Sequence, residues 1–210
     1  QKCRSDPGAF SALARLYSGE DFLKLTREIV GSAARFSDLT LDEALDLFGQ
    51  SPGLTHDKIA QTAIAPGDWE MLQELTPILL ARGGNDAGAG RSLQKIAAPD
   101  ASALEHLKAA FLTQAGTPRA RFPTKDTQKV AAHLLPQLDG LIQRVVEARS
   151  ATLALEAAER AVILHRFARR FADMYAQAKQ RRGWLDFDDL IQKARQLLSN
   201  EAVAAWVLYR

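Results

Sequence analysis

Cysteine is almost absent from this sequence of 210 residues, since Cys3 is the only one. A chain with a single thiol can form neither an internal disulfide nor a zinc site made of thiolates. No apolar run reaches the roughly 18 residues that a membrane span needs, and no signal-peptide pattern opens the chain. We therefore expect a cytoplasmic protein with no membrane partner.

Catalytic and ligand-binding motifs are also missing. His56, His106, His133 and His165 share no ligand spacing, and no nucleophile-elbow motif is present. The glycine-rich stretch GGNDAGAG, residues 83–90, lacks the phosphate-binding loop pattern and follows no strand, so it predicts a flexible surface loop. We expect no catalytic residue, no metal site and no nucleotide site in this chain.

Strand patterns are absent as well, whereas helical periodicity runs through almost the whole sequence. The fold class that this predicts is all-α, with no sheet. Residues 117–125 should be extended, because Pro118 and Pro123 disfavour helix just before them. From residue 126 to about 181 the pattern is helical, with early interruptions at Pro136 and Gly140. Beyond them we expect one very long helix, or two with a break near Ser150.

Shorter helices are expected earlier in the chain, within residues 6–18, 18–36, 40–49, 55–64, 65–84 and 99–116. Thr40 and Glu43 have the spacing of a capping box. Asp68 and Asp100 are candidate N-caps of the helices that follow them.

Charge is unevenly distributed, although the formal net charge is only +2. Residues 101–182 contain 14 Lys and Arg against 7 Asp and Glu, whereas residues 1–100 contain 10 against 14. A basic middle segment is what a polyanion partner requires, but a solvated helical face is an equally good interpretation.

The stretch RRGWLDFDDLI, residues 181–191, places three acids around one phenylalanine. A metal site and a pair of acid–base carboxylates are both conceivable, but no other group is placed to complete them. In the third interpretation Asp186 is an N-cap, and Asp188 and Asp189 lie in the first helical turn, where negative charge complements the helix dipole. We favour this structural interpretation.

The same region resembles the segment just upstream of the Walker B motif in UvrD/Rep-type superfamily 1 DNA helicases. The residues that match are Tyr175, Lys179, Gly183, Leu185, Asp186, Phe187, Asp188, Asp189 and Leu190. The ending AWVLYR and the stretch AFLTQAGTPRARFPTK, residues 110–125, are similar to AddA-type helicase–nuclease subunits of double-strand-break repair.

The resemblance implies that residues 1–178 are the helical insertion (1B-like) domain of the first motor domain. Residues 179–210 would be the return of the chain into the RecA-like motor core. ATP and Mg²⁺ would bind to the parent helicase, since Walker A and Walker B are absent here. The chain would be inactive by itself, with no cofactor. Its partners would be DNA, as single strand or duplex junction, the rest of the motor, and a second, AddB-like subunit.

Ten residues are predicted to contact DNA. They are Arg119, Arg121, Lys125, Arg166, Arg169, Arg170, Lys179, Arg181, Arg182 and Phe187. Other interpretations stay open for several of them. Phe187 could pack on a core, and the arginines of the long helix could form ion pairs with Glu156 or Glu159. Arg119 or Arg121 could hold their loop against a helix C-terminus. Trp184 could form a hydrophobic staple beside Asp186. For the whole chain, the alternative function is a protein–protein interaction module that never contacts DNA.

Overall fold

The computed structural model describes residues 19–98 and 100–199, and in these ranges the protein is all-α, as predicted. Only an isolated bridge between Leu112 and Pro118 departs from helix and loop there. The helix predicted in residues 6–18 and the poor packing predicted for residues 200–210 lie outside the described residues.

The chain divides into two compact units. The central unit is Leu39–Val162, and the terminal unit combines Gln1–Asp38 with Ile163–Arg210. One helix, α9 (Leu135–Arg182), supplies residues to both. The boundary predicted at residues 178 and 179 falls inside α9; as a statement about a parent motor it stays a prediction.

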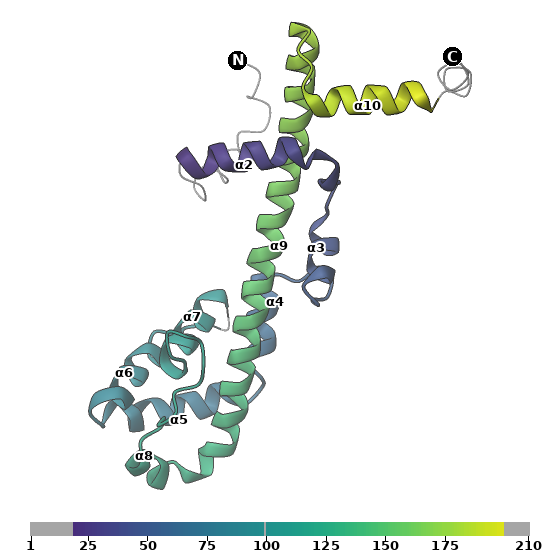
Figure 1. Ribbon diagram of the computed structural model, residues 1–210. Helices are drawn as coiled ribbons and strands as arrows, with labels where there is room; N and C mark the ends of the chain where they lie inside the picture. Colours follow the sequence, from purple (N-terminus) through teal and green to yellow (C-terminus); the bar gives the residue numbers. More distant parts are fainter. Residues whose placement is uncertain (1–18, 99, 200–210) are drawn as a thin grey trace. The chain divides into compact units, whose positions relative to one another are not determined.

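The central unit packs short helices around the first part of α9 (Figure 1). They are α3 (Leu41–Leu47), α4 (His56–Ala63), α5 (Asp68–Leu80), α6 (Gly84–Leu93), α7 (Ala101–Phe111) and α8 (Lys125–Val130), with a 3₁₀ turn at Ala132–Leu134. Leu75, Leu107, Phe111, Leu138 and Val145 are fully buried in one core. The apolar stripes of α5, α7 and α9 therefore face one another, which is how amphipathic helices stabilise a fold.

Several helix starts are fixed by local capping, as the sequence predicts. Thr40 and Glu43 form both bonds of a capping box. The Thr40 N–H and then its hydroxyl donate to the Glu43 carboxylate and hold its pKa below the ordinary value. Asp100 accepts hydrogen bonds from the backbone N–H groups of Ser102 and Ala103 at the start of α7. Each cap satisfies backbone donors that the first helical turn leaves free.

The prediction of a flexible loop at residues 83–90 is wrong, because Gly83 is the N-cap of α6 and the residues after it form the first turns of that helix. Gly90 is buried against α5: a Cβ at this position would lie 3.0 Å from Leu80 Cγ and 3.1 Å from the Leu80 backbone nitrogen. Gly90 thus permits α6 to pack closely on α5. Asp86, fully buried, accepts hydrogen bonds from the hydroxyls of Thr124 and Thr127, both at 2.6 Å.

Asp68 is also not the N-cap that the sequence predicts, since Gly67 occupies that position with φ at 91°. The Asp68 side chain is instead buried and pairs with Arg144 of α9 at 2.5 Å. Arg144 also donates to the Ala63 carbonyl, which ties the end of α4 to α9. The carboxylate therefore joins elements that are distant in sequence.

The end of α7 and the continuity of α9 differ from expectation. The helix α7 ends at Phe111, not near Gly116, which lies in the following turn with φ at 85°. The helix α9 runs for 48 residues without a break at Ser150 or an interruption at Gly140. Pro136 is its second residue, where a missing backbone N–H costs nothing.

The terminal unit contains α2 (Gly19–Gly31), a 3₁₀ turn at Ala33–Arg35, the last part of α9, and α10 (Phe187–Leu198). Phe22 of α2 contacts Phe167 of α9, with ring centroids 5.6 Å apart. Phe167, Phe171 and Tyr175 then stack in succession along α9. Figure 1 shows the chain turning back at the end of α9, so that α10 projects sideways from beside the last part of that helix.

Candidate nucleic-acid interface

The connection from α9 to α10 is a tight turn built on Gly183, whose φ is 65°. The Trp184 N–H donates to the Lys179 carbonyl at 3.0 Å, and the Gly183 N–H donates to the Gln180 carbonyl at 3.2 Å. This pair of bonds is a Schellman motif, which ends a helix on a residue in the left-handed region. Glycine is required there because a Cβ would strain that backbone.

Asp186 then begins α10 as its N-cap, as the sequence predicts. Its carboxylate accepts from the Asp189 N–H at 2.9 Å, and the Asp189 carboxylate accepts from the Asp186 N–H at 3.1 Å. This reciprocal pair is a capping box with acids at both positions.

Lys179 joins the two helices through those acids. Its ammonium group donates to Asp186 at 2.7 Å and to Asp189 at 2.6 Å, and it lies 5.1 Å from the Tyr175 ring centroid. The hydrogen bond from Lys179 holds the pKa of the Asp186 carboxyl below its ordinary value, and the two acids raise the pKa of Lys179. We call Lys179, Asp186 and Asp189 the Lys179 clamp.

Around the clamp, large apolar and cationic side chains are exposed. Phe187 is 81% exposed and Trp184 60%, so neither packs on a core in the part of the chain that the structure describes. Arg181 is exposed, and the Arg182 guanidinium lies 4.8 Å from the Trp184 ring centroid. An aromatic ring beside arginines is a surface that a nucleic-acid strand can use, since bases stack on rings and phosphates pair with cations.

The three arginines predicted to share a face of α9 have different environments. Arg166 and Arg170 are exposed, whereas Arg169 forms an ion pair with Asp38. The suggested ion pair to Glu156 exists, but Arg160 makes it.

In the central unit, Arg119 donates to the carbonyls of Ala109 and Leu112. It therefore holds its loop against the end of α7, which confirms one of the alternatives left open by the sequence. Arg121 and Lys125 are exposed.

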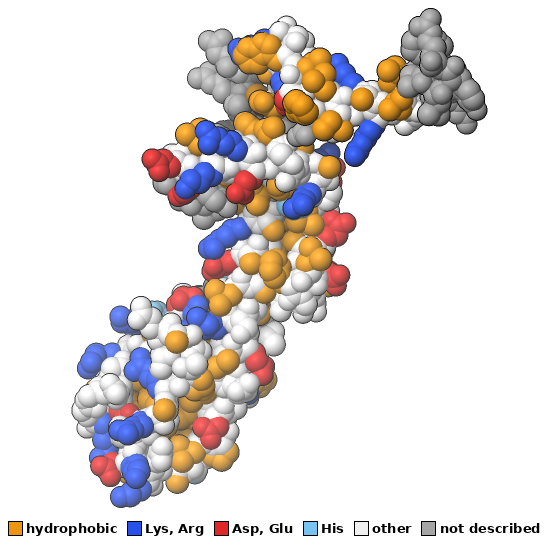
Figure 2. All heavy atoms as spheres, in the orientation of Figure 1, with side chains coloured by type: hydrophobic (Ala, Val, Ile, Leu, Met, Phe, Trp, Pro, Cys, Tyr) orange, Lys and Arg blue, Asp and Glu red, His pale blue; other side chains and the backbone are white. Residues whose placement is uncertain are grey.

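Sequence reasoning missed further cations in the central unit. The bonds from Asp86 to Thr124 and Thr127 join α6 to the segment that leads into α8. They bring together the exposed cations of both regions, which are Arg91, Lys95, Arg121, Lys125 and Lys129. Figure 2 shows blue side chains gathered over this end of the unit. We call these five residues the α6–α8 basic group.

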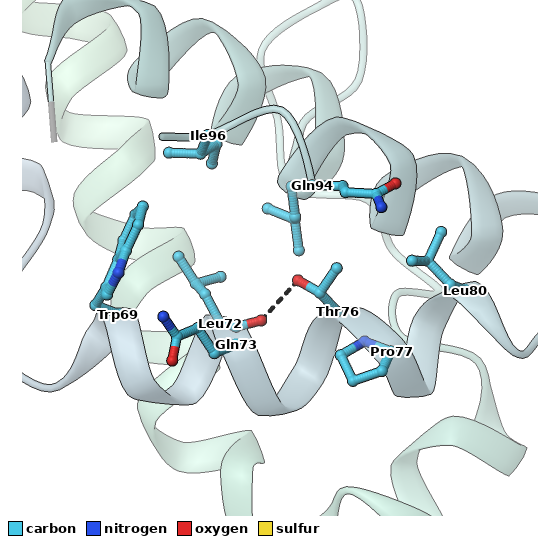
Figure 3. Close-up of a pocket in the computed structure, with 9 residues that line it drawn as sticks. Trp69, Leu72, Gln73, Thr76, Pro77, Leu80, Gln94 and Ile96 are labelled. Carbon is cyan, nitrogen blue, oxygen red and sulfur yellow. Dashed lines mark hydrogen bonds between the residues drawn. The ribbon is translucent and has the colours of Figure 1, made fainter. Parts of the chain in front are cut away.

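A cavity of about 370 Å³ opens between α5 and the end of α6 (Figure 3). Its wall contains Trp69, Leu72, Thr76, Leu80 and Ile96, with the amides of Gln73 and Gln94 also present. We call it the Trp69 cavity; no sequence pattern points to it, because its residues come together only through the packing of α5 on α6.

No family model, curated protein or solved structure matches this chain. Over residues 19–98 and 100–199, no helix is both long and apolar enough to cross a bilayer. Nor do three His, Cys, Asp or Glu side chains in those ranges gather as a metal site would require.

Proposed function

We propose that this chain is the helical, DNA-guiding part of an ATP-dependent DNA helicase of the UvrD/Rep type, similar to the AddA subunits that act in double-strand-break repair. The observation that carries the proposal is Phe187, which is 81% exposed at a rigidly capped helix start. ATP and Mg²⁺ would bind to other parts of the helicase, and an AddB-like subunit would be a further partner.

The Lys179 clamp supports this role by fixing the backbone from which Phe187 projects. Three charged groups and a capping box hold the start of α10 against the end of α9. Because the backbone at Phe187 is already ordered, less conformational freedom is lost when a base stacks on the ring, so more of the stacking free energy appears as affinity. Stacking on an aromatic side chain contributes about 1–3 kcal/mol per base.

The predicted cations then divide by what they contact. Arg166, Arg181 and Arg182 are exposed and can pair with phosphates. Arg170 is exposed too, although it also interacts with another group of the chain. Lys179, Arg169 and Arg119 already bind carboxylates or carbonyls, and their contribution is to position the surface.

A second candidate function, a protein–protein interaction module, rests on a different observation. Leu190, Ile191, Leu197 and Leu198 form a stripe on α10 and are each between 44% and 58% exposed. Such a stripe at helical spacing normally packs on another element. The two functions are compatible if this stripe contacts the motor core while Phe187 contacts DNA.

The experiment is a fluorescence anisotropy titration with labelled single-stranded and duplex DNA. Replacing Phe187 by Leu removes the ring and keeps an apolar side chain, whereas Phe187→Trp keeps a ring. The expected result is that Phe187→Leu weakens single-strand binding by about 5- to 150-fold and Phe187→Trp does not.

Leu198→Ala is the matched control, because it removes a half-exposed apolar side chain from the same helix. DNA affinity that falls equally in Phe187→Leu and Leu198→Ala would show that the Phe187 ring makes no specific contact with a base, and base stacking at Phe187 would be refuted. No DNA binding by the wild-type chain at low salt would refute DNA guidance.

A further inference from the structure

The Trp69 cavity has the composition of a small-ligand site. Cavities that bind small molecules usually exceed about 300 Å³, are mainly apolar, and carry a few polar groups that orient the ligand. This one, at about 370 Å³, is lined by apolar side chains with two glutamine amides and one indole. In Figure 3 the Trp69 ring rises from α5 along one side of the cavity towards Ile96.

The polar groups in the cavity wall are largely unused by the protein. Thr76 donates its hydroxyl proton to the Leu72 carbonyl at 2.6 Å. By contrast, the amides of Gln73 and Gln94 and the Trp69 Nε1–H make no hydrogen bond to any described residue. Both glutamines are exposed, so a planar ligand with donors and acceptors on its edge would replace water on their amides, and a glutamine amide matches the edge of a nucleobase in particular.

Cations flank the same helix end. Arg91 lies in the last turn of α6, and Lys95 comes directly after Gln94. Both are exposed, and neither forms an ion pair within the described ranges. They belong to the α6–α8 basic group, which gives the central unit further exposed cations on the segment that leads into α8.

We propose that the Trp69 cavity binds one unstacked base of a DNA single strand, with its neighbouring phosphates on Arg91 and Lys95. The inference rests on the proposed DNA-guiding function and adds a second contact, in the central unit, to the one at Phe187. The indole supplies a stacking face, the amides bind the base edge, and the two cations neutralise the backbone.

The test uses the intrinsic fluorescence of Trp69 in a Trp184→Phe, Trp206→Phe background, titrated with an oligodeoxyadenylate of about 16 nucleotides. The expected result is saturable quenching of Trp69, with the same midpoint as DNA binding measured by anisotropy. Trp69→Leu in the wild-type background should weaken strand binding by at least about fivefold, and Trp69→Phe by less. Circular dichroism checks that both variants are folded.

Cation variants test the phosphate contacts. Log affinity falls as log salt rises, and the double variant Arg91→Ala, Lys95→Ala should make this fall less steep. The magnitude of the slope should decrease by about 1.4, or about 0.7 for each cation that no longer neutralises a phosphate. The matched control is Arg160→Ala, which removes an exposed arginine from α9 in the same unit and should leave the slope unchanged.

The outcomes separate this inference from the proposed function. The cavity site is refuted, and DNA guidance stands, if Phe187→Leu weakens strand binding while Trp69 fluorescence is not quenched and Trp69→Leu leaves the affinity unchanged. If free deoxyadenosine monophosphate binds the cavity as tightly as the oligonucleotide, the site is not for a strand. If no strand binds at all, both proposals fail.

Discussion

The packing of α6 against α5 can be tested by a matched pair of glycine substitutions. Gly90→Ala places a methyl group 3.0 Å from Leu80 Cγ and 3.1 Å from the Leu80 backbone nitrogen. The leucine side chain can rotate, but the backbone nitrogen moves only if α5 shifts. Gly88→Ala, on the same helix, meets nothing nearer than the Arg91 Nη2 atom at 4.0 Å.

The magnitudes follow from two opposing effects. Alanine in place of glycine inside a helix stabilises by roughly 0.5–1 kcal/mol, because the unfolded chain has less freedom to give up on folding. Forcing a methyl group into a packed contact costs about 1–3 kcal/mol. Gly88→Ala should therefore raise the free energy of unfolding by about 0.5–1 kcal/mol, and Gly90→Ala should lower it by about 0.5–2 kcal/mol.

The assay is urea unfolding followed by far-UV circular dichroism, with the free energy extrapolated to water. Opposite signs for the two variants are expected. Equal stabilisation by both would mean that residues 83–90 are not packed against α5, and the description of α6 as a close-packed glycine helix would be wrong.

Three further predictions concern buried and charged groups. Asp86→Ala leaves the buried Thr127 hydroxyl and the exposed Thr124 hydroxyl without their carboxylate acceptor and should destabilise by about 1–3 kcal/mol in the same unfolding assay, whereas Asp86→Asn should cost less. Arg144→Met removes the cation that pairs with the buried Asp68 carboxylate, which keeps only its hydrogen bonds from Ala65 and Gln137, and should cost about 2–3 kcal/mol, most of which the double variant with Asp68→Leu recovers. In the Lys179 clamp, the folded pKa of Asp186 lies below its ordinary 3.8 and that of Lys179 above its ordinary 10.5. The clamp's contribution to stability should therefore be constant between pH 3.8 and 10.5, and be lost as pH falls below the first value or rises above the second. An NMR titration of the amide proton bound to Asp186 checks this, and a transition at the ordinary value of 3.8 would contradict it.

Local features of the fold could be predicted from the sequence. The capping box at Thr40 and Glu43 and the N-caps at Asp100 and Asp186 depend on residues within three positions of one another. The length of α9 follows from a long stretch rich in helix formers.

What could not be predicted depends on partners that are distant in sequence. Asp68 resembles an N-cap because nothing nearby indicates Arg144, 76 positions away, as its partner. The glycines of residues 83–90 are typical of a loop, and only the contact of Gly90 with Leu80 explains why they are helical.

The candidate site divides in the same way. The N-cap at Asp186 could be predicted from the sequence, but the exposure of Phe187 and the hydrogen bonds of Lys179 could not. The first half of the chain is net acidic by sequence, which hides the fact that Arg91 and Lys95 join the cations of α8. That grouping depends on the Asp86 bonds across 38 and 41 positions.

The most direct test of DNA guidance is the salt dependence of single-strand affinity for the wild-type chain and for Arg181→Ala with Arg182→Ala. If these arginines neutralise phosphates, log affinity falls linearly with log salt, and the magnitude of that slope is smaller by about 1.4 in the double variant. An unchanged slope, or no measurable affinity at the lowest salt, would contradict the account.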